Sequence, residues 1–499
     1  MTARLIGKPE WLGPGLAASM ALVGLELGLR VATGTPSLPE LIEDRVLALV
    51  PGELFSLALE RLEYLGKPLL LVGLVGLLLV AGLAGAALLR RLVWSRLTAW
   101  GRGRSTALGA ALGLVVGLLV SLALAQPRTD PGLAGQVIPF VAYGLVFGAL
   151  ANTKQASSSS GFNARRRALV QLIATGAGAL VTAASLEQLL RAGAEADPGT
   201  SAGLPEGVSP AITPTPDFYV VSKNFVDPVV QAEGWSLEIR GLVDRPLSLA
   251  YSDLLGLPSV EVERTLECIS NPIGGRQISN GTWRGVPFGH LLELANARPE
   301  ATEVAFTSAD NYREHLPIDK VRDPDTLLVH TLNGEPLTPK HGFPARVLTT
   351  GLYGMKNPKW VRTIELVDRA ERGYWERRGW TPTAPIRTMA RIDVPRVSQR
   401  VSSRELVVGG IAFAGERGIQ RVEVSLDEGQ TWSPAQHESD RPASVWVRWV
   451  ARIRLPGPDP VQLMVRAVDG QGDVQDATVR RSFPSGASGY HRVLIEQEA

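Results

Sequence analysis

The most reactive side chain in the 499-residue sequence is its only cysteine, Cys268, in the stretch TLECISNPIGG. With no second cysteine it cannot form an internal disulfide, so its use is packing, nucleophilic chemistry or metal ligation. The six histidines are scattered, and no spacing typical of a zinc site is present. A cysteine nucleophile would require a nearby base and an oxyanion hole, and the local sequence indicates neither. A single thiolate does suffice for a soft or high-valent metal whose other ligands come from a cofactor.

The segment before Cys268 reads as a β-strand, and a Gly/Pro-rich loop follows it. This arrangement predicts a thiol at a domain surface or cleft, where the backbone can approach a ligand closely. Short alternating segments mixed with helix-like pieces predict an α+β domain over 217–385. Four further alternating segments predict a C-terminal immunoglobulin-like β-sandwich without a disulfide over 386–499.

The first 190 residues differ from the rest, because long stretches of them carry almost no charge. Most of these stretches approach the roughly 20 residues that a membrane-spanning helix needs. They predict an N-terminal all-α membrane domain of five helices over 1–190, although a buried helical core in a soluble protein is the alternative. Their glycines and alanines allow close contact between helices. The five predicted spans are Leu12–Val31, Leu69–Leu89, Ser105–Ala125, Gly135–Ala151 and Ala168–Leu190.

The distribution of basic residues predicts the orientation of these spans. The basic loops fall on one side if the N-terminus is cytoplasmic, which places the later domains on the extracytoplasmic side of the cell membrane. A Pro/Gly/Ser-rich linker over 191–216 would tether them. Arg165, Arg166 and Arg167 precede the fifth span. They are either ordinary positive-inside charge or part of a twin-arginine export signal.

Composition also limits the partners. The formal charge of +2 and the lack of a basic stripe interleaved with aromatic residues argue against nucleic-acid binding. No histidine precedes His290, so the predicted spans cannot supply two histidine ligands to a haem. They would either anchor the chain or take part in electron transfer through a quinone or a partner subunit.

The region from about residue 217 to 471 resembles the molybdenum-dependent sulfite oxidase family. The stretches FYVVSKN, TLECISN, LNGEPLTPKHGFPARV, GLYGMKNPKWV and GYWERRGW carry this resemblance in the family's order, and VEVSLDEGQTW resembles its C-terminal dimerisation domain. The resemblance implies a molybdopterin cofactor that carries molybdenum, and a possible homodimer. It covers roughly half of the chain and does not explain the first 190 residues.

The resemblance also implies roles for individual residues. Cys268 would be the thiolate ligand of molybdenum, and a second set would contact the pterin or its phosphate. Arg and Lys donors suit a phosphate dianion. The implied cofactor-binding residues are Asn224, Asp310, His341, Arg346 and Lys359, with backbone groups around Asn357 and Pro358.

Three departures from the family pattern bear on the substrate. Trp380 stands where sulfite oxidases have a tyrosine, and indole has no ionisable hydroxyl. FYVVSKN offers only Lys223 in place of an oxyanion-binding arginine, and CISNPIGG lacks the arginines that follow the cysteine. We therefore expect two-electron oxygen-atom transfer on a small oxyanion or an S- or N-oxide, with Cys268 and Trp380 at the reaction centre.

Several alternatives remain at this level. A methionine-sulfoxide-type reductase of envelope proteins, a metal-free membrane-tethered binding module and a cysteine-nucleophile enzyme are each compatible with the sequence. The electron carrier would be a quinone, a cytochrome or a partner membrane subunit.

Overall fold

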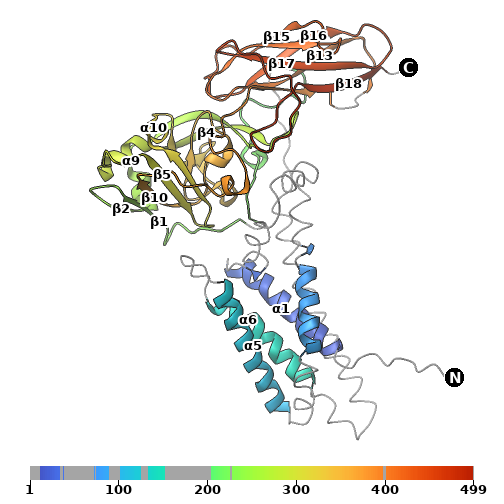
Figure 1. Cartoon of the computed structure of the whole chain (residues 1–499). Coiled ribbons are helices and arrows are strands. Elements are labelled where there is room, and N and C mark those ends of the chain that lie inside the picture. Colours follow the sequence, from blue (N-terminus) through green and yellow to red (C-terminus); the bar gives the residue numbers. More distant parts are fainter. Residues whose placement is uncertain are drawn as a thin grey trace, which may run out of the picture. The chain divides into compact units, whose positions relative to one another are not determined.

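A computed structural model describes residues 12–33, 37–38, 72–73, 75–88, 102–124, 133–151, 204–224, 227–396 and 400–497. The chain divides into two compact units. One is helical and comes from the N-terminal part of the chain. The other is rich in β-strands and contains nearly all of the described residues from 204 onward (Figure 1).

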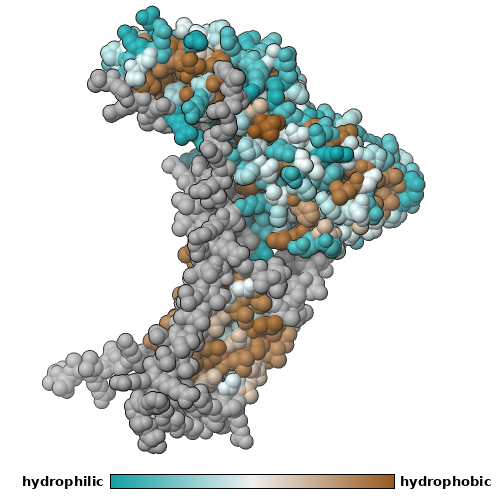
Figure 2. Space-filling model, turned by 180° about the vertical axis from the view of Figure 1, so that it is seen from behind, coloured by the Kyte–Doolittle hydropathy of each residue, from teal (hydrophilic) through white to brown (hydrophobic). Residues whose placement is uncertain are grey.

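The helical unit contains α1 (Leu12–Thr33), α5 (Arg102–Leu124) and α6 (Leu133–Ala151). Both α1 and α5 pack against α6. Glycines permit this close approach, because a Cβ atom on Gly144 would lie 2.0 Å from the carbonyl oxygen of Gly109. The close helix contact expected from the Gly- and Ala-rich sequence is therefore present between α5 and α6. Apolar side chains cover much of the described surface of this unit (Figure 2).

The prediction of a five-helix membrane domain is wrong. Among the helices that the structure describes, none combines the length and the apolar character needed to cross a membrane. In α1, Glu26 and Arg30 interrupt the apolar stretch and lower the apolar character of the helix. The fifth predicted span, Ala168–Leu190, and the arginines at 165–167 lie outside the described residues.

The predicted α+β domain is built on two sheets. The first has the strand order β2-β1-β10-β5-β6, with β1 parallel to β10 and the other pairs antiparallel. Alternating burial along its strands gives one apolar face, which packs in a large core with α8, α9 and α10. The elements are β1 (Ser236–Gly241), β2 (Leu247–Ala250), β5 (Glu303–Ser308), β6 (Arg313–Pro317), β10 (Val361–Val367), α8 (Tyr251–Gly256), α9 (Phe288–Ala295) and α10 (Ile318–Arg322).

The second sheet positions the cysteine. Its order is β3-β4-β7-β8, and β9 pairs with the first half of β7, on the edge opposite β4. Trp283 lies at the centre of a core between these strands and the chain around Phe218, with the two rings edge to face. The strands are β3 (Val260–Glu267), β4 (Ile278–Pro287), β7 (Leu327–Leu332), β8 (Glu335–Pro336) and β9 (Arg346–Leu348).

The C-terminal strands form one eight-stranded sheet in the order β11-β13-β16-β15-β14-β17-β18-β12. This corrects the predicted immunoglobulin-like sandwich of two separate sheets. The reason is β15, which pairs with β14 on one side and with β16 on the other. It therefore connects the strands into one sheet, and alternation of apolar residues along a strand does not reveal such a pairing. The strands are β11 (Met389–Val394), β12 (Arg400–Val401), β13 (Glu405–Phe413), β14 (Ile419–Ser425), β15 (Ser433–His437), β16 (Val447–Arg454), β17 (Val461–Asp469) and β18 (His491–Gln497).

The C-terminal sheet packs directly on the chain that follows β3. Ile269, Trp380 and Phe413 belong to one buried cluster, and the ring of Phe483 meets Trp380 edge to face at 5.2 Å between centroids. The last part of the predicted linker contacts β4, since the backbone N–H of Thr213 donates to the carbonyl oxygen of Asn280 over 2.8 Å. The boundaries of the four predicted domains stay predictions.

Candidate molybdopterin site

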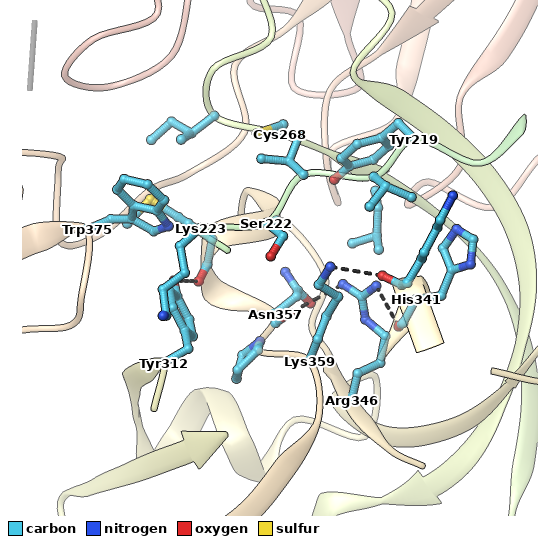
Figure 3. A pocket seen from close by; sticks show the side chains of 18 of the residues that line it. Tyr219, Ser222, Lys223, Cys268, Tyr312, His341, Arg346, Asn357, Lys359 and Trp375 are labelled. Atoms are coloured by element: carbon cyan, nitrogen blue, oxygen red, sulfur yellow. Dashed lines mark hydrogen bonds between the residues drawn. The ribbon is translucent and has the colours of Figure 1, made fainter. Parts of the chain in front are cut away.

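A single pocket brings together most of the predicted site residues. It encloses about 860 Å³ of space between its walls and the adjoining solvent. Cys268 and Tyr219 lie on one side of it, and His341, Arg346 and Lys359 lie on another (Figure 3). Eight predicted residues line it, namely Cys268, Asp310, His341, Arg346, Asn357, Pro358, Lys359 and Trp380. The ninth, Asn224, is buried but is not among the lining residues.

Cys268 is the first residue after β3, and its position is fixed by backbone hydrogen bonds. Its N–H donates to the carbonyl oxygen of Gln277, and its carbonyl oxygen accepts from the N–H of Asn271. Its Sγ lies 3.0 Å from the hydroxyl oxygen of Ser270, which in turn donates to Gln277. The thiol is 8% exposed. The loop therefore holds a sulfur atom at the pocket wall with its backbone groups already satisfied.

Arg346 supplies a buried positive charge to the opposite wall. Its two terminal nitrogens donate to the carbonyl oxygens of His341 and Asn357, each over 3.3 Å, and its guanidinium lies over the ring of Trp283. Burial lowers the pKa of Arg346 to about 10, so it remains charged at neutral pH. Nearby, Lys359 donates to the carbonyl oxygen of Lys340 over 2.9 Å.

His341 is neutral in this environment. Its Nε2 lies 3.3 Å from the carbonyl oxygen of Phe218, and its Nδ1 lies 2.7 Å from the hydroxyl of Thr338. A carbonyl can only accept, so we assign the ring proton to Nε2. Burial, aided by the charges of Arg346 and Lys359, lowers the pKa of His341 to about 4. The imidazole is thus an uncharged part of the pocket wall, close to the cations of Arg346 and Lys359.

Close backbone packing around Gly342 and Asn357 positions the cations of the pocket. Gly342 has φ +107°, and a Cβ atom there would lie 3.0 Å from Cβ of Lys359. Asn357 closes the turn, because its side-chain oxygen accepts from the N–H of Thr349 over 2.6 Å. Glycine is the residue that tolerates such a backbone conformation. Gly342 and Asn357 therefore set the positions of Arg346 and Lys359.

Sequence reasoning missed several lining residues. Tyr312 is buried and Tyr219 is partly buried in the pocket wall, and Met355 and Trp375 also line it. Burial raises the pKa of Tyr219 well above its usual value, as does the nearby Cys268, so Tyr219 stays protonated. Tyr219 and Trp375 belong to the stretches FYVVSKN and GYWERRGW, which drew attention for other residues.

The residues of the pocket fit an anionic cofactor that carries a soft metal. Arg346 and Trp380 each bear a buried nitrogen donor, Nε and Nε1 respectively, that has no hydrogen-bond partner among the described residues. Buried donors of this kind are costly unless a ligand satisfies them. Acceptor oxygens of a bound pterin phosphate or metal oxo group would do so, and the Cys268 thiolate would supply a soft ligand.

Comparison with known sequence families identifies both parts of the β-rich unit. Residues 224–375 match the oxidoreductase molybdopterin binding domain, and residues 386–498 match the Mo-co oxidoreductase dimerisation domain.

Individual relatives agree with these matches. Mitochondrial sulfite oxidase from Rattus norvegicus is 29% identical over 339 residues, or 57% of this chain and 61% of that protein. This chain thus spans about six-tenths of the length of the mitochondrial enzyme. Sulfite oxidase from Arabidopsis thaliana is 26% identical over 58% of this chain and 89% of its own length.

Two further relatives strengthen the assignment. The uncharacterized oxidoreductase YuiH from Bacillus subtilis (strain 168) is 35% identical over 146 residues, which are 29% of this chain and 72% of that protein. The crystal structure of the sulfane dehydrogenase SoxCD from Paracoccus pantotrophus superimposes with a TM-score of 0.53 and 26% identity, over 58% of this chain and 82% of that one. This chain therefore belongs to the sulfite oxidase family of molybdopterin-dependent oxidoreductases.

Proposed function

We propose that this chain is a molybdenum enzyme that catalyses two-electron oxygen-atom transfer on a small oxyanion or an S- or N-oxide. The observation that carries the proposal is the buried thiol of Cys268, held at one wall of a pocket whose other wall presents the buried cation of Arg346. A soft thiolate suits the metal at one end of a molybdenum–pterin cofactor, and a desolvated guanidinium suits the phosphate at its other end.

When bound, the molybdenum cofactor supplies the two-electron chemistry, with water as the source or sink of oxygen. The protein supplies the rest. Cys268 would hold the metal, and Arg346 and Lys359 would neutralise the phosphate. The carbonyl oxygens of His341 and Asn357 would keep Arg346 in place through the hydrogen bonds described above. Trp380 would donate its N–H group to an oxygen atom bound in the pocket.

The wall near Cys268 favours an uncharged S-oxide over a dianion. Trp375, Trp380 and Met355 contribute apolar surface, and the ammonium of Lys223, which also lines the pocket, lies 4.0 Å from the carboxylate of Asp310. This pairing leaves less positive charge for a substrate such as sulfite. A reductase of sulfoxides, including oxidised methionine in envelope proteins, is therefore the second candidate.

Three further parts of the proposal rest on the sequence and the family. A homodimer would form through residues 386–498, which match a dimerisation domain. A quinone, a cytochrome or a partner subunit would carry the electrons. The extracytoplasmic location of the β-rich unit stays a prediction.

Elemental analysis of the full chain, expressed in a host that makes molybdopterin, tests the proposal. We expect about one molybdenum per chain in the wild type and nearly none in Cys268→Ser, because a hydroxyl is a hard and weak donor. Ser425→Ala is the matched control, since Ser425 is also buried at the end of a strand but lies in the C-terminal sheet. Metal-free wild type, or a full metal load in Cys268→Ser, would refute the proposal.

Turnover separates the two substrate candidates. Sulfite, sulfoxides and N-oxides are offered in turn with an artificial electron carrier. Faster turnover of a neutral sulfoxide than of sulfite supports the reductase, and the reverse order supports an oxidase of small oxyanions.

A further inference from the structure

Behind the pocket, outside the site described above, five ionisable side chains form an unbroken chain of contacts. Glu314 and His315 lie on β6, Glu303 lies on the neighbouring strand β5, and two short 3-10 helices supply the others, Lys356 on η3 (Gly354–Lys356) and Glu376 on η4 (Glu376–Arg378). The side chains of Glu314, Lys356 and Glu376 are at most 3% exposed.

The contacts within this chain are short. The ammonium of Lys356 donates to Glu314 over 2.7 Å and to Glu376 over 2.5 Å. The other oxygen of Glu376 lies 3.2 Å from Nε2 of His315, and Nδ1 of His315 lies 3.3 Å from Glu303. Every neighbour is thus within hydrogen-bonding distance.

His315 links the buried part of the chain to its more exposed end. Both of its ring nitrogens lie within hydrogen-bonding distance of carboxylate oxygens, which accept when ionised, so either nitrogen can donate to its neighbour. The ring thus joins Glu376 to Glu303, whose side chain is 16% exposed.

The other end of the chain reaches the pocket through Tyr312. This residue lines the pocket, and its hydroxyl oxygen lies 3.3 Å from Glu314 and 2.7 Å from the carbonyl oxygen of Met355. The hydroxyl can donate to one of these groups and accept a proton from a protonated Glu314. A route of protonatable atoms therefore runs from the pocket wall to the surface.

The proposed reaction gives such a route protons to carry. Oxidation of a substrate with oxygen from water releases two protons for each pair of electrons, and reduction consumes two. Tyr312, a side chain of the pocket wall, is placed to exchange these protons.

We infer that Glu314, Lys356, Glu376, His315 and Glu303 conduct protons between the pocket and solvent, with Tyr312 as the entry group. In each transfer one O–H or N–H bond breaks and another forms, and no electron moves along the chain. A proton that enters at Glu314 is matched by one that leaves from Glu303. This inference rests on the proposed function, since that reaction supplies or consumes the protons.

The electrostatics of Glu314 suit a group that exchanges protons. Burial raises the pKa of its carboxyl, while the charge and hydrogen bond of Lys356 lower it. The N–H of His315 also donates to it, and Glu376 adds a repelling charge. The pKa of Glu314 is thus higher than that of an exposed glutamate, so its carboxyl takes up a proton from a neighbour more readily.

Blocking the chain at two separate points tests the inference. Glu314→Gln and His315→Ala each interrupt it, and we expect each to lower kcat of the molybdenum-loaded enzyme about 100-fold with KM unchanged. Imidazole should restore part of the turnover of His315→Ala, because His315 is 12% exposed. The solvent deuterium isotope effect should rise in both variants. The matched control is Glu423→Gln, which removes an ion-paired carboxylate of the C-terminal sheet.

A second readout does not depend on turnover. Infrared spectra of the metal-free wild type, recorded as a pH titration, should show the C=O stretch of a protonated buried carboxyl that is absent from Glu314→Gln. The midpoint of this band should shift in His315→Ala. A wild type without such a band, or a band unchanged in Glu314→Gln, would overturn the inference.

The outcomes also separate this inference from the proposed function. Wild type that binds no molybdenum refutes the function. Molybdenum-loaded wild type together with a fully active Glu314→Gln refutes the proton route alone. Loss of turnover in His315→Ala without rescue by imidazole, and without a change in the isotope effect, indicates a structural role and also refutes the route.

Discussion

Replacing Lys356 with methionine should produce one of the largest losses of stability available from a single substitution in this domain. The ammonium of Lys356 is 2% exposed and lies between the carboxylates of Glu314 and Glu376, which are 0% and 3% exposed. Methionine keeps much of the volume but removes the charge, so two buried carboxylates then face each other without compensation. Removing one partner of a buried ion pair costs about 3–5 kcal/mol, and we expect Lys356→Met to lose that much at neutral pH.

The pH dependence of this loss has a definite sign. Burial already raises the pKa of Glu314 in the folded protein, and losing the ammonium raises it further. A carboxyl whose pKa is higher in the folded than in the unfolded state destabilises the fold at high pH, where it is ionised. This destabilisation decreases as the pH falls and the carboxyl becomes protonated. The deficit of Lys356→Met relative to wild type should therefore shrink as the pH falls from about 8 to about 5.

Urea unfolding of the full chain, followed by tryptophan fluorescence at several pH values, measures this deficit. Lys320→Met is the matched control, because Lys320 also contacts two carboxylates but is 20% exposed. A partly exposed pair of this kind contributes about 1 kcal/mol or less. If Lys356→Met loses no more stability than Lys320→Met, or if its deficit grows as the pH falls, the reasoning is wrong.

Three other substitutions test the pocket itself. His341, whose pKa is lowered to about 4 from 6.5, binds a proton more readily in the unfolded chain, so stability should fall by up to about 3 kcal/mol as the pH drops between these values. Unfolding curves of His341→Gln should lack this part of the dependence. Gly342→Ala should cost about 1–3 kcal/mol in urea unfolding because of its φ of +107°, and an unchanged midpoint would contradict the strain. Trp380→Phe keeps the ring but removes the unsatisfied N–H; we expect KM to rise about fivefold with stability unchanged, whereas an unaltered KM would exclude a bond to substrate.

Eight of the residues predicted for the site line one pocket of the structure, and their roles there stay predictions. The two errors in the fold have a common cause, because periodicity reports which residues are apolar but not what they pack against. Apolar stretches alone could not decide whether the N-terminal helices cross a membrane. Alternation alone could not show that β15 joins two halves of one sheet.

The sequence by itself determined the chemistry that is available to this protein: one thiol after a strand, and a fixed order of cationic and glycine-rich segments. These properties are local, since each depends on residues within a few positions of one another. Only the tertiary structure decided that Glu303, Glu314, Lys356 and Glu376 meet around His315. They come from separate elements, and burial of their charges is favourable only where the folded backbone holds each carboxylate against its cation.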